Sequence, residues 1–148
     1  MPITFAICGC GSRGLEAYAS YQKLHPEEMQ IVAGADCRPG RLALLREWYG
    51  VPEDKCFNSD EELLAQPKLA DVMLVATQDR QHVPTALKAL DKGYHVLLEK
   101  PISPDLGECL QLQRKAQETG RTVVVCHVLR YAPFYAAIKD LLDKGALG

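Results

Sequence analysis

A lysine that could handle a proton lies in the segment Glu99-Lys100-Pro101. The apolar residues 95–98 before it predict a strand, and ligands of an open α/β sheet bind outside the carboxyl ends of the strands. Because Pro101 fixes its own φ and biases the preceding residue toward an extended conformation, Lys100 leaves this strand in a defined direction. A lysine so placed can donate or accept a proton on a bound molecule. The alternative is an exposed loop lysine paired with Glu99.

A glycine-rich segment near the N-terminus has the spacing G-x-G-x-x-G: Gly9-Cys10-Gly11-Ser12-Arg13-Gly14. It follows an apolar run at 3–8 and opens a stretch of helical character, which is the context that the dinucleotide-binding fingerprint requires. In that fingerprint Gly9 permits a tight turn, Gly11 lets backbone amides approach a pyrophosphate, and Gly14 lets helix and strand pack closely. We interpret the segment as a dinucleotide site, against the alternative of an ordinary glycine-rich connection.

An acidic residue, Asp36, ends the next predicted strand, roughly 20 residues beyond the glycine segment. A carboxylate there can accept hydrogen bonds from the adenosine ribose hydroxyls and would repel a 2′-phosphate, so it favours NAD over NADP. Arg38 leaves NADP open as the cofactor, since a nearby arginine can accommodate that phosphate. The alternative for Asp36 is a turn or cap residue before Pro39.

Further candidate residues follow the fourth predicted strand. Ala76 and Thr77 come directly after it, and His82 stands just before a helix that contains Pro84. We expect these residues to line the nicotinamide pocket, with helix capping as the alternative role of Thr77 and His82.

Six apolar, β-rich runs alternate with helical segments and would position these residues. The predicted strands are 3–8, 30–35, 56–58, 71–76, 94–98 and 122–126. Helices are predicted at 15–24, 39–50, 60–66 with Asp60 as its N-cap, 84–93 and 106–120, the last indicated by Leu106, Cys109, Leu110 and Ala116. This alternation predicts an α/β fold with a doubly wound, mainly parallel sheet and helices on both faces.

The composition argues against several classes of protein. A formal net charge of −2 gives no electrostatic reason to expect nucleic acid or a membrane surface as a partner. No apolar run approaches the roughly 18 residues that span a bilayer, and the N-terminus lacks a signal-peptide pattern. The 6 cysteines form no disulfide framework, so they predict reduced thiols in the cytoplasm. Cys8 and Cys10 are interpreted as a buried thiol and a loop residue, and no metal site is predicted.

In combination, the chain resembles the N-terminal domain of the glucose–fructose oxidoreductase / inositol dehydrogenase / MocA (Gfo/Idh/MocA) family over essentially its whole length. The segments that carry the resemblance are Gly9-x-Gly11-x-x-Gly14, Asp36, Val75-Ala76-Thr77 followed by His82, the stretch from Gly93 to Pro101, and Tyr131-x-Pro133.

The resemblance implies a Rossmann dinucleotide-binding domain at residues 1–128 and a bridging segment and helix at 129–148. The bridge would lead to a C-terminal substrate and oligomerisation domain that this sequence does not contain. The implied activity is that of a nicotinamide-dependent oxidoreductase acting on sugars, polyols or related alcohols and carbonyls, as a homo-oligomer at full length. We expect the 148 residues alone to bind NAD and to turn over little or no substrate.

The resemblance also assigns roles to residues. Lys100 would contact the reacting oxygen and move or stabilise its proton, and Glu99 would orient the lysine or balance its charge. The predicted cofactor-binding residues are Gly9, Cys10, Gly11, Ser12, Arg13, Gly14, Asp36, Arg38, Ala76, Thr77, His82, Glu99, Lys100 and Pro101.

Two other functions remain open at this point. The chain could be a non-catalytic dinucleotide-sensing module, or a protein-interaction adaptor in which Lys100 is structural. The final helix carries an apolar stripe of Phe134, Ile138, Leu141 and Leu142. This stripe either packs on the sheet or faces another domain or a second copy of the chain.

Overall fold

The computed structural model describes residues 1–146. Its strands are β1 (Ile3–Cys8), β2 (Met29–Ala35), β3 (Cys56–Phe57), β4 (Val72–Val75), β5 (His95–Leu98) and β6 (Val123–Val125). They form one sheet in the order β3-β2-β1-β4-β5-β6, and all neighbouring strands are parallel. The predicted doubly wound α/β fold is confirmed. Because the strand order reverses between β1 and β4, the sheet has its switch point there, where such folds bind ligands.

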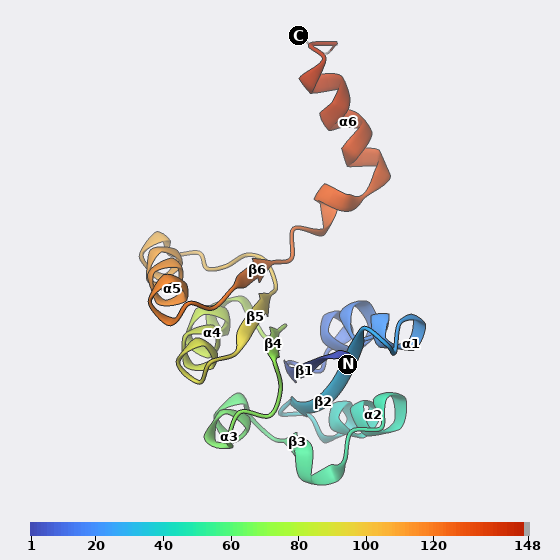
Figure 1. Ribbon diagram of the computed structural model, residues 1–148, viewed down its shortest axis with the longest axis vertical. Coiled ribbons are helices and arrows are strands. Elements are labelled where there is room, and N and C mark those ends of the chain that lie inside the picture. The colour runs from blue at the N-terminus through green and yellow to red at the C-terminus, as the bar shows by residue number, and fades with distance from the viewer. Residues whose placement is uncertain (147–148) are drawn as a thin grey trace.

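Helices cover both faces of the sheet, as predicted. They are α1 (Tyr21–Leu24), α2 (Pro39–Tyr49), α3 (Asp60–Ala65), α4 (His82–Asp91), α5 (Leu106–Thr119) and α6 (Pro133–Asp143). In Figure 1, α3, α4 and α5 lie on one side of the sheet, and α1 and α2 lie on the other.

Successive side chains along a strand point to opposite faces of the sheet, and this alternation divides the core into two apolar layers. In β4, Met73 and Val75 belong to the layer under α3, α4 and α5, whereas Leu74 belongs to the layer that includes residues of α2. All three side chains are fully buried. The continuous apolar run of β4 is therefore explained by a strand that is covered on both faces.

The segment after the glycine loop differs from the single helix predicted at 15–24. Ser12–Tyr18 forms a π-helical segment, and a separate short helix, α1, follows it. The Ala19 N–H bonds to the Gly14 carbonyl at 3.0 Å, which is the i to i+5 spacing of a π-turn.

The start of α3 also differs from the prediction, which placed Asp60 at the N-cap. Ser59 is the N-cap residue, and its hydroxyl accepts a hydrogen bond from the Glu62 N–H at 3.2 Å. Asp60 is the first helical residue, and its carboxylate accepts a hydrogen bond from the Thr85 hydroxyl of α4. Ser59 has extended backbone angles, so its side chain rather than that of Asp60 reaches the unpaired N–H groups of the first turn.

The helix predicted from Leu106, Cys109, Leu110 and Ala116 is present as α5, but not all four residues face the core. Leu106 and Leu110 are exposed, and the buried side chain of this helix is Leu112. Cys109 and Ala116 are partly buried, and Ala116 packs with Leu112 against the sheet. The inward face therefore follows Cys109, Leu112 and Ala116, which share one side of a helix at i, i+3 and i+7.

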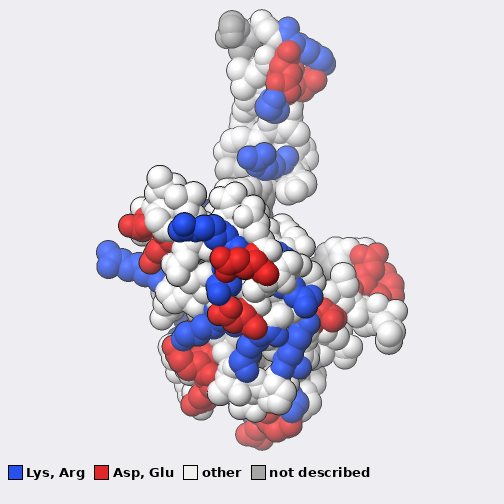
Figure 2. Space-filling view, turned by 60° about the vertical axis from the view of Figure 1, so that its left-hand side comes forward, with Lys and Arg blue, Asp and Glu red and all other residues white. Residues whose placement is uncertain are grey.

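The last helix, α6, does not pack on the sheet. It projects beyond β6 (Figure 1), and none of its described residues is buried. Figure 2 shows the projecting segment with broad uncharged areas, whereas Lys, Arg, Asp and Glu intermix on the body of the molecule. Phe134, Leu141 and Leu142 of the predicted apolar stripe are all exposed. Among residues 1–146, no helix has the length and apolar character needed to cross a membrane.

Candidate functional site

A cavity of about 720 Å³ opens at the carboxyl ends of the central strands. Its walls come from the loops after β1, β2, β3 and β4, so it lies at the switch point of the sheet. The predicted site residues that line it are Gly9, Gly11, Ser12, Arg13, Asp36, Arg38, Ala76 and Thr77. The other predicted residues, Cys10, Gly14, His82, Glu99, Lys100 and Pro101, are not among its lining residues.

Two glycines of the loop are required by the packing of the protein itself. Gly9 has φ +93°, and a Cβ there would lie 2.4 Å from the Ala76 carbonyl oxygen. A Cβ on Gly14 would lie 2.2 Å from the carbonyl oxygen of Gly9 and 3.2 Å from Cγ2 of Ile7. Gly9 therefore permits the turn, and Gly14 permits close approach of the helical segment to β1.

Gly11 is different, because the protein leaves room for a side chain there. The nearest atom to a Cβ on Gly11 would be Nη2 of Arg38 at 3.6 Å, an ordinary van der Waals distance. The absence of a side chain at Gly11 keeps the backbone open to the cavity. The Leu15 N–H bonds back to the Gly11 carbonyl at 2.9 Å. The N–H groups at the start of a helix point outward without an acceptor in the helix itself, so those before Leu15 are available to a ligand.

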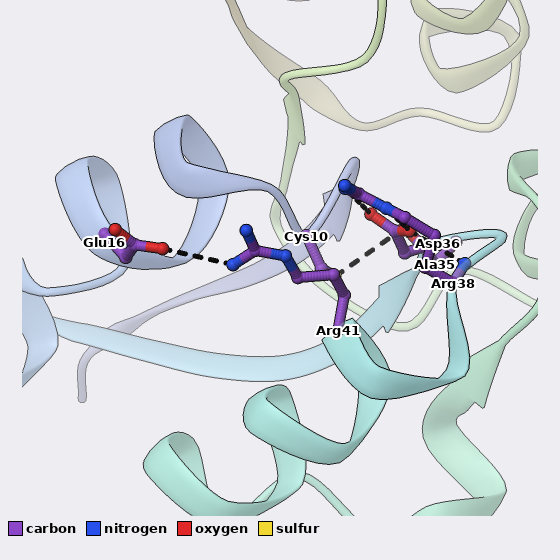
Figure 3. A network of polar contacts seen from close by, with 6 residues as sticks. All are labelled: Cys10, Glu16, Ala35, Asp36, Arg38 and Arg41. Atoms are coloured by element: carbon purple, nitrogen blue, oxygen red, sulfur yellow. Dashed lines mark hydrogen bonds and ion pairs between the residues drawn. The ribbon is translucent and has the colours of Figure 1, made fainter.

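Asp36 and Arg38 form an ion pair at the end of β2 (Figure 3). The Arg38 Nε and Nη2 atoms donate to Asp36 Oδ1 and Oδ2 at 3.0 and 3.2 Å, and the Arg38 backbone N–H donates to Oδ1 at 2.9 Å. Burial acts to raise the pKa of Asp36, but the hydrogen bonds and charge of Arg38 outweigh it, so the pKa is lowered. The carboxylate is thus ionised and already paired on the cavity wall.

A second ion pair lies beside the first. Arg41 Nη1 is 3.1 Å from Glu16 Oε1, which joins the start of α2 to the helical segment after the glycine loop (Figure 3). The nearby Cys10 thiol is directed at the Ala35 carbonyl oxygen at 3.6 Å. Burial raises the pKa of Cys10 to about 12, so this thiol is a packed, neutral group.

Cys8 and Cys10 do not face each other. Cys8 belongs to the apolar layer under α4, and Cys10 belongs to the layer on the opposite face. The Cys8 thiol contacts the Met73 sulfur at 3.5 Å instead. These two residues therefore do not form half of a metal site.

Thr77 and His82 have separate places although both follow β4. Thr77 lines the cavity, and its hydroxyl oxygen is buried without a hydrogen-bond partner in the described structure. The His82 ring is 1% exposed, with Nδ1 at 2.7 Å from the Pro101 carbonyl oxygen and Nε2 at 3.1 Å from that of Thr77. His82 is thus buried outside the cavity lining, and it connects the main chain of the loop after β4, which lines the cavity, to that of the loop after β5.

Lys100 is exposed at the end of β5, whereas Glu99 is 6% exposed. The Glu99 Oε2 atom accepts the Lys100 backbone N–H at 2.6 Å. Arg13 Nε lies 3.7 Å from Oε1 of the same carboxylate. Among the described residues, no ion pair joins the Glu99 carboxylate to the Lys100 ammonium, so the contact between the two residues is the hydrogen bond to the Lys100 main chain.

Sequence reasoning missed about half of the cavity wall. The additional lining residues are Ala35, Cys37, Arg41, Asn58, Ser59, Asp60, Glu61, Gln78 and Gln81. One signal for Asn58 and Ser59 was available, because they follow the short third strand at the same edge of the sheet as Asp36.

Comparison with known proteins agrees with this geometry. Residues 3–127 match the family model described as an oxidoreductase family with an NAD-binding Rossmann fold. Trans-1,2-dihydrobenzene-1,2-diol dehydrogenase from Mus musculus is 28% identical over 148 residues, which is 100% of this chain and 44% of that protein.

Solved structures share the fold. The WlbA dehydrogenase from Bordetella pertussis, in complex with NADH and UDP-GlcNAcA, has a TM-score of 0.87 at 24% identity, over 100% of this chain and 44% of that chain. Scyllo-inositol dehydrogenase from Lactobacillus casei, with bound NAD(H) and scyllo-inositol, has a TM-score of 0.86 at 21% identity. This match covers 100% of this chain and 43% of that chain. The chain spans less than half the length of these relatives.

The family match covers the glycine segment, Asp36 and Glu99-Lys100-Pro101, and it confirms the resemblance inferred from these motifs. The chain belongs to the Gfo/Idh/MocA oxidoreductase family, and residues 3–127 are its NAD-binding Rossmann domain.

Proposed function

We propose that the cavity at the switch point binds NAD in preference to NADP, in an enzyme that transfers a hydride to or from a sugar, a polyol or a related alcohol or carbonyl compound. The observation that carries this proposal is the cavity of about 720 Å³ that runs from the glycine loop to Asp36. A dinucleotide needs both ends of such a site, one for its pyrophosphate and one for its adenosine ribose.

Two features of the cavity wall fit a bound dinucleotide. The open backbone at Gly11 gives a pyrophosphate access to the N–H groups of Ser12 and Arg13. The buried hydroxyl of Thr77 lacks a partner within the described structure, and a polar ligand atom would satisfy it.

The adenosine end favours NAD through Asp36. Its paired carboxylate can accept hydrogen bonds from ribose hydroxyls, whereas a 2′-phosphate would meet negative charge. Arg38 is paired with Asp36 in the structure, so it is already neutralised at this position. Asp60 and Glu61 add further acidic groups to the same wall.

Lys100 is the proposed acid–base residue. The nicotinamide ring, when bound, supplies or accepts the hydride. Lys100 protonates the reacting oxygen during reduction, or accepts its proton during oxidation. Glu99 supports this role by holding the Lys100 backbone N–H at 2.6 Å.

We further propose that residues 1–128 are the cofactor-binding domain, that 129–148 lead to a substrate domain, and that the 148 residues alone turn over little substrate. The relatives are more than twice as long, and α6 exposes Phe134, Leu141 and Leu142 of its apolar stripe. We also propose a cytoplasmic location, supported by the 6 cysteines, all of which are free thiols.

Titration with NADH, followed by its fluorescence, tests the proposed site. We expect saturable binding by the unchanged chain and at least about tenfold weaker binding by Gly11→Val, because the added Cβ makes only an ordinary contact with Arg38 and the added methyl groups obstruct the phosphate path. Gly40→Ala is the matched control, because nothing lies within 4 Å of its added Cβ. An adaptor would show no saturable signal, which would overturn the proposal.

A separate experiment distinguishes an enzyme from a sensor. In a chain extended through its substrate region and saturated with cofactor, Lys100→Met should reduce hydride transfer by about 100-fold or more, because the acid–base group is lost. Hydride transfer that survives nearly intact would show that Lys100 does not have this role.

A further inference from the structure

Tyr18 and Glu99 are joined by a hydrogen bond across the end of the sheet. The Tyr18 hydroxyl donates to Glu99 Oε1 at 2.6 Å, although the two residues are 81 positions apart in the chain. Tyr18 is the last residue of the π-helical segment that begins at Ser12, and Glu99 directly follows β5. The bond therefore connects the helical segment after the glycine loop to the strand end that carries Lys100.

Both oxygens of the Glu99 carboxylate are used in this arrangement. Oε1 accepts the Tyr18 hydroxyl, and Arg13 Nε lies 3.7 Å from it. Oε2 accepts the Lys100 backbone N–H at 2.6 Å. Since the side chain of Glu99 is buried, its carboxylate needs these donors and has a single orientation when they are present.

Tyr18 is a constant donor in this pair. Its burial, its hydrogen bond to Glu99 and the neighbouring Cys126 thiol together raise the pKa of Tyr18 well above its usual value. The hydroxyl thus keeps its proton at physiological pH. Cys126 directly follows β6, so the tyrosine also lies against the next strand end.

We propose that Tyr18 is a positioning residue for Lys100: it fixes the Glu99 carboxylate, which in turn fixes the Lys100 main chain. The inference rests on the proposed function, in which Lys100 acts on the substrate. Nothing else donates a side-chain hydroxyl to Glu99 among residues 1–146. Displacement of a catalytic group by about 1 Å is enough to reduce a reaction rate strongly, so an acid–base lysine gains from this support.

Amide hydrogen exchange measured by NMR on the 148-residue chain tests this role directly. The probe is the Lys100 N–H, and the variant is Tyr18→Phe, which removes only the hydroxyl. Tyr21→Phe is a matched control, because Tyr21 also donates to a glutamate, Glu28, at 2.6 Å, but on the exposed surface. The amides of Ile7 and Val96, in buried central strands, report on global stability.

We expect exchange of the Lys100 amide to become about tenfold faster in Tyr18→Phe, since a hydrogen bond to a charged acceptor is lost from the pair that orders it. Tyr21→Phe should leave it within about twofold of the unchanged chain. Unchanged Lys100 exchange in Tyr18→Phe would overturn the inference. Equal acceleration at Lys100, Ile7 and Val96 would also overturn it, because Tyr18 would then support the fold as a whole.

The NADH titration of the unchanged chain keeps this inference separate from the proposed function. If NADH does not bind, the proposed function fails whatever the exchange rates are. If NADH binds and the Lys100 amide does not respond to Tyr18→Phe, the positioning role fails alone.

Discussion

The Nδ1 atom of His82 lies 2.7 Å from the carbonyl oxygen of Pro101, which joins the first residue of α4 to the loop after β5. The other ring nitrogen lies 3.1 Å from the carbonyl oxygen of Thr77, so one buried ring contacts the main chains of two loops. His82, which the sequence predicts to line the nicotinamide pocket, is thus buried between the loops that carry Thr77 and Lys100 and does not line the cavity. Its cofactor-binding role stays a prediction.

Replacement of His82 should destabilise the protein. His82→Ala removes a buried ring and leaves main-chain carbonyl groups without their contact, so we expect the free energy of unfolding to fall by about 2–4 kcal/mol. Urea denaturation measures this change. His127→Ala is the control, because His127 is exposed, and its effect should stay within about 0.5 kcal/mol. Equal stabilities of the two variants would contradict the bridging role.

Gly9→Ala should be far more harmful than Gly40→Ala. Gly9 has φ +93°, and its added Cβ would lie 2.4 Å from the Ala76 carbonyl oxygen, so we expect a loss of at least about 2 kcal/mol in stability. Gly40 lies in α2 with open space around it, and alanine there should stabilise the helix by up to about 1 kcal/mol. Thermal unfolding of both variants measures their relative stability. A Gly9→Ala variant as stable as Gly40→Ala would contradict the requirement for glycine at this turn.

Asp36→Ala should change cofactor preference. Removal of the carboxylate frees Arg38 from its ion pair and removes the charge that repels a 2′-phosphate, so the affinity for NADPH relative to NADH should rise by about tenfold or more. Fluorescence titration with both cofactors gives the ratio. In the double variant with Arg38→Ala, we expect most of this gain to disappear. An unchanged ratio in Asp36→Ala would refute the assignment of Asp36.

The Asp36–Arg38 pair should contribute to stability in a pH-dependent way. The pKa of Asp36 is lowered below its ordinary value of 3.8 in the folded protein, so the contribution is fully present above that value and is lost as the pH falls through the folded pKa. We therefore expect Arg38→Ala to be less stable than the unchanged chain at pH 7, with the difference shrinking below about pH 4. Denaturation at several pH values measures the stability difference between the two proteins. A difference that grows on acidification would contradict a stabilising Asp36–Arg38 ion pair.

Thiol labelling should distinguish Cys37 from Cys10. Cys37 is exposed and lines the cavity, whereas Cys10 is buried with its pKa raised to about 12, so iodoacetamide at pH 8 should modify Cys37 first and leave Cys10 intact. Bound NADH should slow the modification of Cys37. Mass spectrometry of the digested protein locates the label, and rapid labelling of Cys10 in the folded chain would contradict its burial.

Much of the fold could be predicted because its signals are local. Gly50 and Gly120 end α2 and α5 in the left-handed conformation, and the continuous apolar run of β4 marks a strand covered on both faces. The glycine segment was recognisable for the same reason, since the positive φ of Gly9 and the close contact of Gly14 with Gly9 and Ile7 arise in a short turn between one strand and one helical segment, although Gly9 also packs against Ala76 after β4.

The sequence by itself therefore determined the fold class, the family and the edge of the sheet where the site lies, because these follow from periodicity and short-range backbone geometry. Only the tertiary structure decided which side chains meet there. Residues far apart in the chain are joined by the Tyr18–Glu99 hydrogen bond and by the contact of His82 with Pro101. The cavity likewise brings Asn58, after β3, together with residues that follow other strands. Such contacts depend on strand order and on the packing of helices over the sheet, so local patterns in the sequence do not predict them.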